Sequence, residues 1–169
     1  MQSSLCIFFG LKYKKDVESG LFFLSAKIIL RHPTDQSKVL LIKRMVNGKF
    51  SYEPAGGKVE CDFKSKIAES LEECAVREAQ EELGLTVKIE HYIGSYYFFW
   101  IIDSNKCSSC ALFIGTITSQ DEEFVANADA CELPIEPEWI MIDNLINKKV
   151  PIDVCHVGLE NLMINYFSK

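Results

Sequence analysis

Apolar and β-branched residues alternate with turn-forming residues along the first third of the chain. The segments Leu21–Leu30 and Val39–Ile42 are rich in strand-forming side chains, and the stretch 32–38 between them is polar and contains a proline. This pattern predicts a β-hairpin. A short strand is predicted over Lys49–Tyr52, and the pair Gly56-Gly57 after it predicts a tight loop, where backbone freedom is needed.

The clearest helix is predicted over residues 71–83. Ser70 is a good N-cap and Glu73 follows three residues later, which together form the signature of a capping box. Gly84 stands where a helix-ending glycine is expected. Small or apolar residues recur at every fourth position and predict a buried stripe, formed by Ala75, Ala79 and Leu83.

The remaining patterns complete a mixed fold. The apolar run Leu5–Phe9 predicts a strand near the start, and further strands are predicted over Thr86–Ile93, Ser95–Ile102, Ala111–Ile117 and Ile135–Ile142. Gly94, between the first two of these, predicts a bend or a bulge. Helices are predicted over Asp143–Lys149 and Val154–Phe167. Strands, helix, strands and helix in this order predict an α/β fold in which helices cover both faces of a mixed sheet, an α/β/α sandwich. A chain of 169 residues without repeats fits a single domain, 1–169.

Composition and charge limit the classes of molecule that this protein is expected to bind. The formal charge is −6, and Lys and Arg never cluster beyond a pair, so we expect no polymeric nucleic acid as a main partner. No apolar stretch reaches the roughly 18 residues of a membrane span. Seven cysteines in apolar contexts favour a reducing compartment, the cytoplasm. A small phosphate ligand stays compatible with this charge, because a metal held by carboxylates can supply the missing positive charge.

The pair Cys107 and Cys110 has the spacing of half a zinc site. Closed zinc sites usually show a second ligand pair, and the sequence offers none at a regular spacing. We therefore favour a turn with two small residues at its tip.

Three acids crowd one face of the predicted helix. Glu78, Glu81 and Glu82 lie at offsets of three and four, so their carboxylates come within about one turn of each other. Like charges at these spacings cost a helix a few tenths of a kcal/mol per pair. A solvated helix end is the usual meaning of a bare Glu-x-x-Glu-Glu string, but a hard divalent cation with oxygen ligands would offset the same repulsion.

The surroundings of these acids favour the cation. A Gly-Gly pair precedes the helix, Arg77 adjoins the first acid and a glycine follows the last. The string resembles the Nudix box, whose pattern is Gly, five residues, Glu, seven residues, then Arg-Glu-apolar-x-Glu-Glu-x-Gly-apolar. Residues 69–85 match it throughout when Ala79 counts as the apolar position. Eleven residues stand between Gly57 and Glu69 in place of five, so Cys61–Ala68 looks like an inserted loop, expected to be mobile and to influence substrate choice.

The resemblance implies roles for these residues. It implies a Nudix fold in which Mg²⁺, with Mn²⁺ as a substitute, is held by Glu78, Glu81 and Glu82 near a backbone carbonyl of Gly56 or Gly57. Arg77 would orient these acids through a salt bridge shared with Glu69. These five side chains form the expected catalytic set.

Further candidates lie outside the box. Arg44 and Lys58 could bind substrate phosphates, although an ordinary surface charge is equally expected of either. Glu122 and Glu123 could supply a base or a further ligand, against the commoner role of acidic loop residues at a surface. The aromatic run Tyr96–Trp100 could stack on a base, but strand alternation would place half of it in the core.

The resemblance implies a Mg²⁺-dependent pyrophosphohydrolase in which water attacks phosphorus. Its partner would be a small nucleotide-like diphosphate, either a nucleoside diphosphate linked to another moiety or a nucleoside triphosphate. The alternative is a non-catalytic module that keeps the Nudix fold and uses the insertion to bind a nucleotide or a protein. The sequence leaves open the substrate and the oligomeric state, a homodimer included.

Overall fold

The computed structural model describes residues 21–46, 48–62, 64–99, 105–118 and 136–169. The predicted strand at Leu5–Phe9 and the candidates Glu122 and Glu123 lie outside these residues. Ten strands are described: β1 (Leu21–Arg31), β2 (Lys38–Val46), β3 (Lys49–Glu53), β4 (Ala55–Lys58), β5 (Cys61–Asp62), β6 (Ile67–Ala68), β7 (Val87–Phe99), β8 (Lys106–Ile117), β9 (Glu136–Met141) and β10 (His156–Val157).

Eight of these strands form one mixed sheet. Its main path runs β10-β7-β8-β1-β2-β3, while β4 pairs with β1 and β9 pairs with β2. The long pairing of β1 with β8 is parallel, and the other pairings in the sheet are antiparallel. The predicted hairpin of β1 and β2 exists only at its tip, through the partners Leu30↔Leu40 and Arg31↔Val39. Beyond that tip β2 pairs with β3 from Ile42 onward, and it pairs with β9 over Lys38–Lys43, the tip included.

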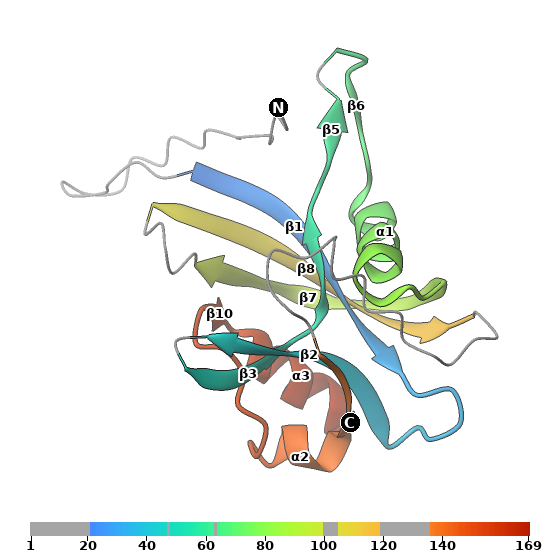
Figure 1. Ribbon diagram of the computed structural model, residues 1–169, viewed down its shortest axis with the longest axis vertical. Coiled ribbons are helices and arrows are strands. Elements are labelled where there is room, and N and C mark those ends of the chain that lie inside the picture. Colours follow the sequence, from blue (N-terminus) through green and yellow to red (C-terminus); the bar gives the residue numbers. More distant parts are fainter. Residues whose placement is uncertain (1–20, 47, 63, 100–104, 119–135) are drawn as a thin grey trace.

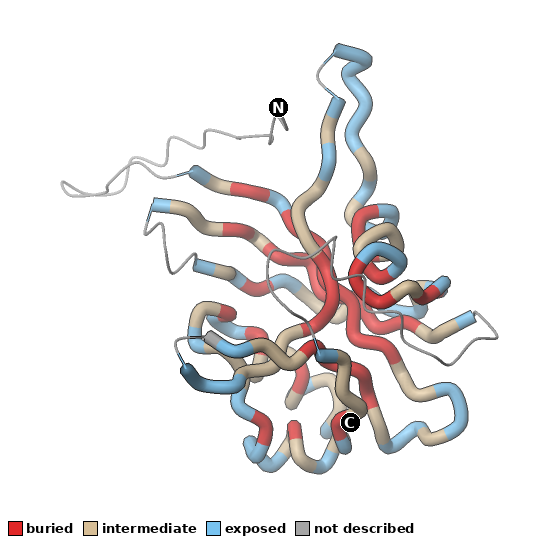
Figure 2. Tube along the Cα trace, in the orientation of Figure 1, coloured by how far each residue is buried: buried red, intermediate tan, exposed pale blue. Residues whose placement is uncertain are grey.

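Helices cover both faces of the sheet (Figure 1). Helix α1 (Leu71–Leu83) packs on β1 and β4, whereas α2 (Ile142–Ile146) and α3 (Leu159–Phe167) lie on the opposite side. The alternating side chains of β1 serve both layers, because Ile28 joins the core under α1 and Ile29 joins the core under α3. Buried residues concentrate in the middle of the sheet, where both layers meet it (Figure 2). The predicted α/β/α arrangement with a mixed sheet is confirmed.

Helix α1 has the bounds that the sequence predicts. The Glu73 backbone N–H donates to Ser70 Oγ at 3.1 Å, and the Ser70 N–H donates to Glu73 Oε2 at 2.7 Å, which completes the capping box. Gly84 ends the helix in the left-handed region at φ 69°. Ala75, Ala79 and Leu83 are buried against the sheet, as the stripe predicts.

Strand β7 joins the two strands predicted on either side of Gly94 into one and has the irregularity expected at that glycine. It runs without interruption from Val87 to Phe99, and register shifts around His91 and Gly94 absorb the irregularity as bulges. Its aromatic residues divide as strand alternation requires: Tyr96 is buried, whereas Tyr97 and Phe99 are largely exposed.

Two predicted turns belong to strands. Cys107 and Cys110 lie inside β8, so the turn predicted there is wrong; residues three apart on a strand face opposite sides, which separates the two thiols. The Gly56-Gly57 pair lies inside β4 rather than in a loop, because β1 provides it with an antiparallel partner.

The structure adds detail to the predicted insertion and moves the start of the predicted final helix. The insertion Cys61–Ala68 contains a small hairpin, in which β5 pairs with β6. The final helix begins at Leu159 and not at Val154, because β10 and Gly158 precede it. None of the helices in the described ranges is both long enough and apolar enough to cross a membrane.

The capping box predicts a measurable loss when its acceptor is removed. Ser70→Ala should lower the free energy of unfolding by about 1 kcal/mol, because one orphan N–H at the start of α1 loses its partner. Urea denaturation measures this loss. Ser70→Asn keeps a side-chain acceptor and should stay close to the wild type; an equal loss in both variants would show that the cap is not the cause.

Candidate active site

The acids of α1 divide between two neighbourhoods. Glu78 is partly buried and Glu81 exposed, and both face Arg77 on the same helix. Glu82 is buried and turns instead toward β2 and β4. The predicted crowding of three acids is therefore relieved by protein partners that differ from one acid to the next.

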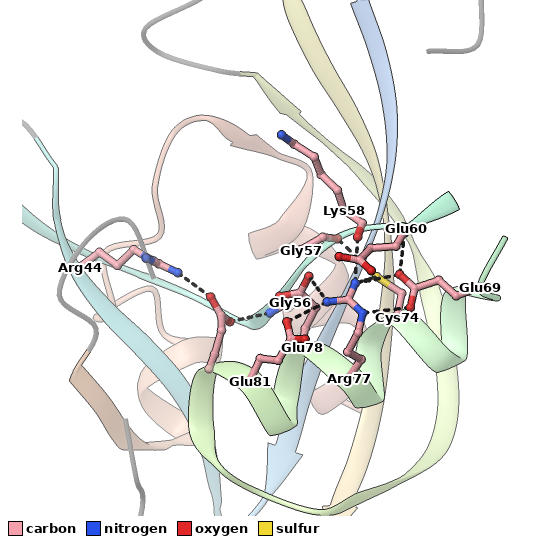
Figure 3. Close-up of polar contacts among 11 residues, drawn as sticks. Arg44, Gly56, Gly57, Lys58, Glu60, Glu69, Cys74, Arg77, Glu78 and Glu81 are labelled. Carbon is pink, nitrogen blue, oxygen red and sulfur yellow. Dashed lines mark hydrogen bonds and ion pairs between the residues drawn. The ribbon is translucent and has the colours of Figure 1, made fainter. Parts of the chain in front are cut away.

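Arg77 is the centre of the first neighbourhood (Figure 3). Its Nε and Nη2 donate to the two oxygens of Glu69 at 3.0 and 2.7 Å, which is a bidentate pair. Its Nη1 donates to Glu78 Oε1 at 3.0 Å and to Glu81 Oε2 at 2.9 Å. Nη2 also donates to the backbone carbonyl of Lys58. One guanidinium thus brings together three carboxylates and ties them to the end of β4.

Glu82 is held by two donors from the sheet. The backbone N–H of Gly56 donates to its Oε2 at 2.9 Å, and Arg44 Nη2 donates to its Oε1 at 2.9 Å. Both oxygens of this buried carboxylate therefore have protein partners.

Gly57 allows the carboxylate of Glu78 to approach the backbone of β4. A Cβ atom at this position would lie 2.2 Å from Glu78 Oε1, far inside contact distance. Only glycine fits here without moving the acid. Glu78 and Glu82 consequently meet β4 at adjacent residues, Gly57 and Gly56.

The pKa of Glu78 is raised, whereas the pKa of Glu69 is lowered. Burial raises the pKa of Glu78, and repulsion from Glu82 and Glu81 adds to it, although Arg77 opposes both. Burial acts on Glu69 in the same way, but hydrogen bonds from Arg77 and Glu60 outweigh it and lower the Glu69 pKa. Burial also raises the pKa of the Cys74 thiol to about 12, so this neighbour stays protonated.

The ligand atoms that these acids offer are of the type that suits a divalent cation. Carboxylate oxygens are the ligands that Mg²⁺ prefers, and Gly57 leaves space for the carboxylate of Glu78 beside β4. In the described part of the chain, however, no three acidic, histidine or cysteine side chains are arranged as an ion would require. Arg77 holds Glu78 and Glu81, while Arg44 and Gly56 hold Glu82. Side-chain rotation would be needed to bring these oxygens onto one ion.

The two cations expected at substrate phosphates are placed differently. Arg44 lies at the site but contacts Glu82 and Glu53. The ammonium of Lys58 lies 5.0 Å from the centre of the Phe23 ring, and this side chain points away from Arg77 and Glu69 in Figure 3.

A second buried ion cluster adjoins Glu82, and the sequence did not single it out. Glu53, at the end of β3, accepts from Lys27 Nζ and from His156 Nε2, each at 3.0 Å, and pairs with Arg44 Nε. Burial opposes ionisation of Glu53, but the charges of Lys27 and Arg44 and the His156 hydrogen bond hold its pKa well below the usual range. The sequence signal for this cluster is Lys27, a charged residue in the middle of the otherwise apolar strand β1, which indicates a buried partner of opposite charge.

Removing Arg77 tests the first neighbourhood. Arg77→Ala leaves Glu69 and Glu78 close together without their shared cation, and we expect a loss of about 2 kcal/mol in unfolding free energy, moderated because the guanidinium is partly exposed. Arg77→Lys should recover only part of it, since an ammonium cannot form the bidentate pair. Chemical denaturation measures both, and wild-type stability of Arg77→Ala would contradict this account.

The low pKa of Glu53 predicts a dependence of stability on pH. A carboxyl whose pKa falls on folding contributes stability that is present above its ordinary value of 4.5 and is lost as the pH falls toward the folded pKa. The difference in unfolding free energy between the wild type and Glu53→Gln should therefore be constant near neutrality and shrink below about pH 4.5. Denaturation at a series of pH values measures it; a difference that persists unchanged to pH 3 would contradict the prediction.

Comparisons with known proteins bear on the fold and the family of this chain. A family model of the NUDIX domain matches residues 22–153. No curated protein matched the sequence. Among solved structures, a MutT protein from Methanosarcina mazei Go1 is 20% identical over 90% of this chain and 96% of its own, with a TM-score of 0.64. A NUDIX hydrolase from Nitrosomonas europaea is 19% identical, covers 86% of this chain and 88% of its own, and has a TM-score of 0.60. At these identities the structures support the fold, and the family match over most of the sequence shows that the chain belongs to the Nudix hydrolase family.

Proposed function

We propose that this protein is a Mg²⁺-dependent pyrophosphohydrolase of a small nucleotide-like diphosphate. The substrate class is a nucleoside diphosphate linked to another moiety, or a nucleoside triphosphate. The observation that carries the proposal is the meeting of Glu78 and Glu82 at adjacent glycines of β4, with Glu81 one turn away on the same guanidinium as Glu78. Five free cysteines among the described residues accord with a reducing, cytoplasmic setting, which we also propose.

The residues of the site would bind the metal, hold the acids in position and accept a proton during hydrolysis. Glu78, Glu81 and Glu82 would hold Mg²⁺, and the bound ion would neutralise the phosphate oxygens and favour attack at phosphorus. Arg77 holds the acids in place from α1, and the Gly56 N–H fixes one oxygen of Glu82. A carboxylate of this cluster accepts the proton of the attacking water, and the products separate without a covalent enzyme intermediate.

A nucleotide panel separates this proposal from a binding module of the same fold. The full chain is incubated with Mg²⁺ and nucleoside triphosphates, nucleotide sugars or dinucleotides, and the release of nucleoside monophosphate, pyrophosphate and phosphate is measured. We expect turnover of at least one class, abolished by EDTA and restored by Mg²⁺ or Mn²⁺. Binding of a nucleotide without turnover of any class would favour the non-catalytic module.

Glu82→Gln tests the acid cluster on the substrate that the panel finds. The change keeps the shape of the side chain but removes a charge from the metal site, so the rate should fall at least about a hundredfold, on the order of 3 kcal/mol. Stability should fall modestly as well, because Glu82 loses its ion pair with Arg44.

A matched variant on the same helix controls for helix charge. Glu72 is exposed in the first turn of α1, and Glu72→Gln should keep the wild-type rate. Near wild-type turnover by folded Glu82→Gln at saturating Mg²⁺ would overturn the assignment of these acids.

A further inference from the structure

An apolar surface lies on the sheet beyond the part that α1 covers. Helix α1 packs on β1, where Ala26 and Ile28 join the core beneath it. Phe22 and Leu24 precede them on the same face, because residues two apart on a strand point to the same side. The start of β1 and the adjoining parts of β7 and β8 extend past the helix (Figure 1). Leu24 is consequently 37% exposed.

The strand register places five further side chains of β7, β8 and β10 on this face. Cross-strand partners point to the same side of a sheet, so the successive partners of Phe22 and Leu24 extend the surface over four strands. The rings of Phe22 and Tyr97 meet edge to face, with their centres 6.5 Å apart. We call this surface the apolar patch; it has no charged residue and consists of Phe22, Leu24, Tyr97, Phe99, Cys107, Ser109 and Val157.

The large side chains of the apolar patch are exposed together. Tyr97 and Val157 are 51% and 52% exposed, and Phe99 is 47% exposed. Tyr96 and Phe98, which alternate with them along β7, pack into the core under α3 instead. Single exposed apolar residues are ordinary on a protein surface, whereas a contiguous group on neighbouring strands marks a surface that another segment or molecule covers.

The chain itself contains an apolar segment close to the patch in sequence. Strand β1 begins at Leu21, one residue before Phe22, and the preceding residues 1–20 lie outside the described residues. They include the run Leu5–Phe9, five apolar residues in succession. Residues 10–20 connect this run to β1 and contain five charged side chains and a glycine at each end. A polar connection therefore joins an apolar run to the edge of the apolar patch.

This connection is long enough for the run to reach every strand of the patch. Eleven residues span at most about 40 Å when extended. The four strands of the patch lie about 4.8 Å apart and so spread over about 14 Å. A segment joined to its binding surface by a short connection acts at an effective concentration on the order of mM, which a separate molecule rarely reaches. The connection therefore favours the chain's own run over a second copy of the protein.

We propose that the run Leu5–Phe9 packs on the apolar patch of its own chain. This packing removes apolar side chains of both segments from water, and their burial stabilises the contact. The patch is then an intramolecular docking surface and not an interface between subunits. The proposal involves none of the acids of α1, so it does not depend on the proposed function.

Hydroxyl-radical footprinting of the full chain tests whether the patch is covered. Phe50 lies in β3, outside the patch, and is a matched reference for Phe99, because the two are 51% and 47% exposed. If the run covers the patch, Phe99 should be oxidised severalfold more slowly than Phe50 in the wild type. Equal rates of oxidation would show that the patch is open and would overturn the proposal.

Substitutions in the run identify what covers the patch. Ile7→Asp/Phe8→Asp places two charges in the run, and charged side chains do not pack on an apolar surface. Tyr97 and Phe99 should therefore be oxidised severalfold faster in this variant than in the wild type, while the rate for Phe50 stays unchanged. Slow oxidation of Phe99 that persists in the variant would exclude the run as the covering segment.

A control variant separates loss of the run from an effect of added charge. Leu11→Asp/Tyr13→Asp adds the same charge within the connection and should keep the wild-type rates. Equal acceleration in both variants would contradict specific packing of the run. A wild-type protection of Phe99 that decreases on dilution would assign the patch to a second copy and likewise overturn the proposal.

Discussion

Close packing of carboxylates is the constraint around which this site is built. Five glutamates converge where α1 meets the sheet, and at these separations they repel unless cations lie between them. Arg77 serves Glu69, Glu78 and Glu81, and the pair Lys27 and Arg44 serves Glu53 and Glu82. Arg77 joins α1 to the end of β4, and Arg44 joins it to β2 and to Glu53, so both ion clusters contribute to the position of α1 on the sheet.

Small residues make this contact short enough. Ala75 and Ala79 are fully buried on the face of α1 that packs on the sheet, and β4 presents glycines where the acids arrive. A larger side chain at either surface would separate the helix from the strand. Packing and electrostatics therefore depend on each other here: the small residues bring the helix close, and the ion pairs make that closeness tolerable for the acids.

The sequence predicts the features that depend on neighbours along the chain. The capping box, the terminal Gly84 and the spacing of the acids are local signals, and α1 has the predicted bounds. The buried cluster could not be predicted, because Lys27, Glu53 and His156 come from separate strands and no periodicity links them. Pairing between distant strands also explains why two predicted turns are wrong. The small residues around Gly56-Gly57 and between Cys107 and Cys110 indicate turns locally, but both segments pair with β1 and are strands.

The base of the β5–β6 hairpin has a consequence for how the chain can vary. The Glu69 N–H donates to the Glu60 carbonyl at 3.1 Å, and the Glu60 N–H donates to Glu69 Oε1 at 2.7 Å. These two hydrogen bonds join the ends of the insertion just below the β5–β6 hairpin. The position of Glu69 beside Arg77 therefore depends on these bonds and not on the residues of the hairpin itself. Changes in the length or sequence of the hairpin are expected to leave the acids of α1 in place, so this segment can vary between related proteins.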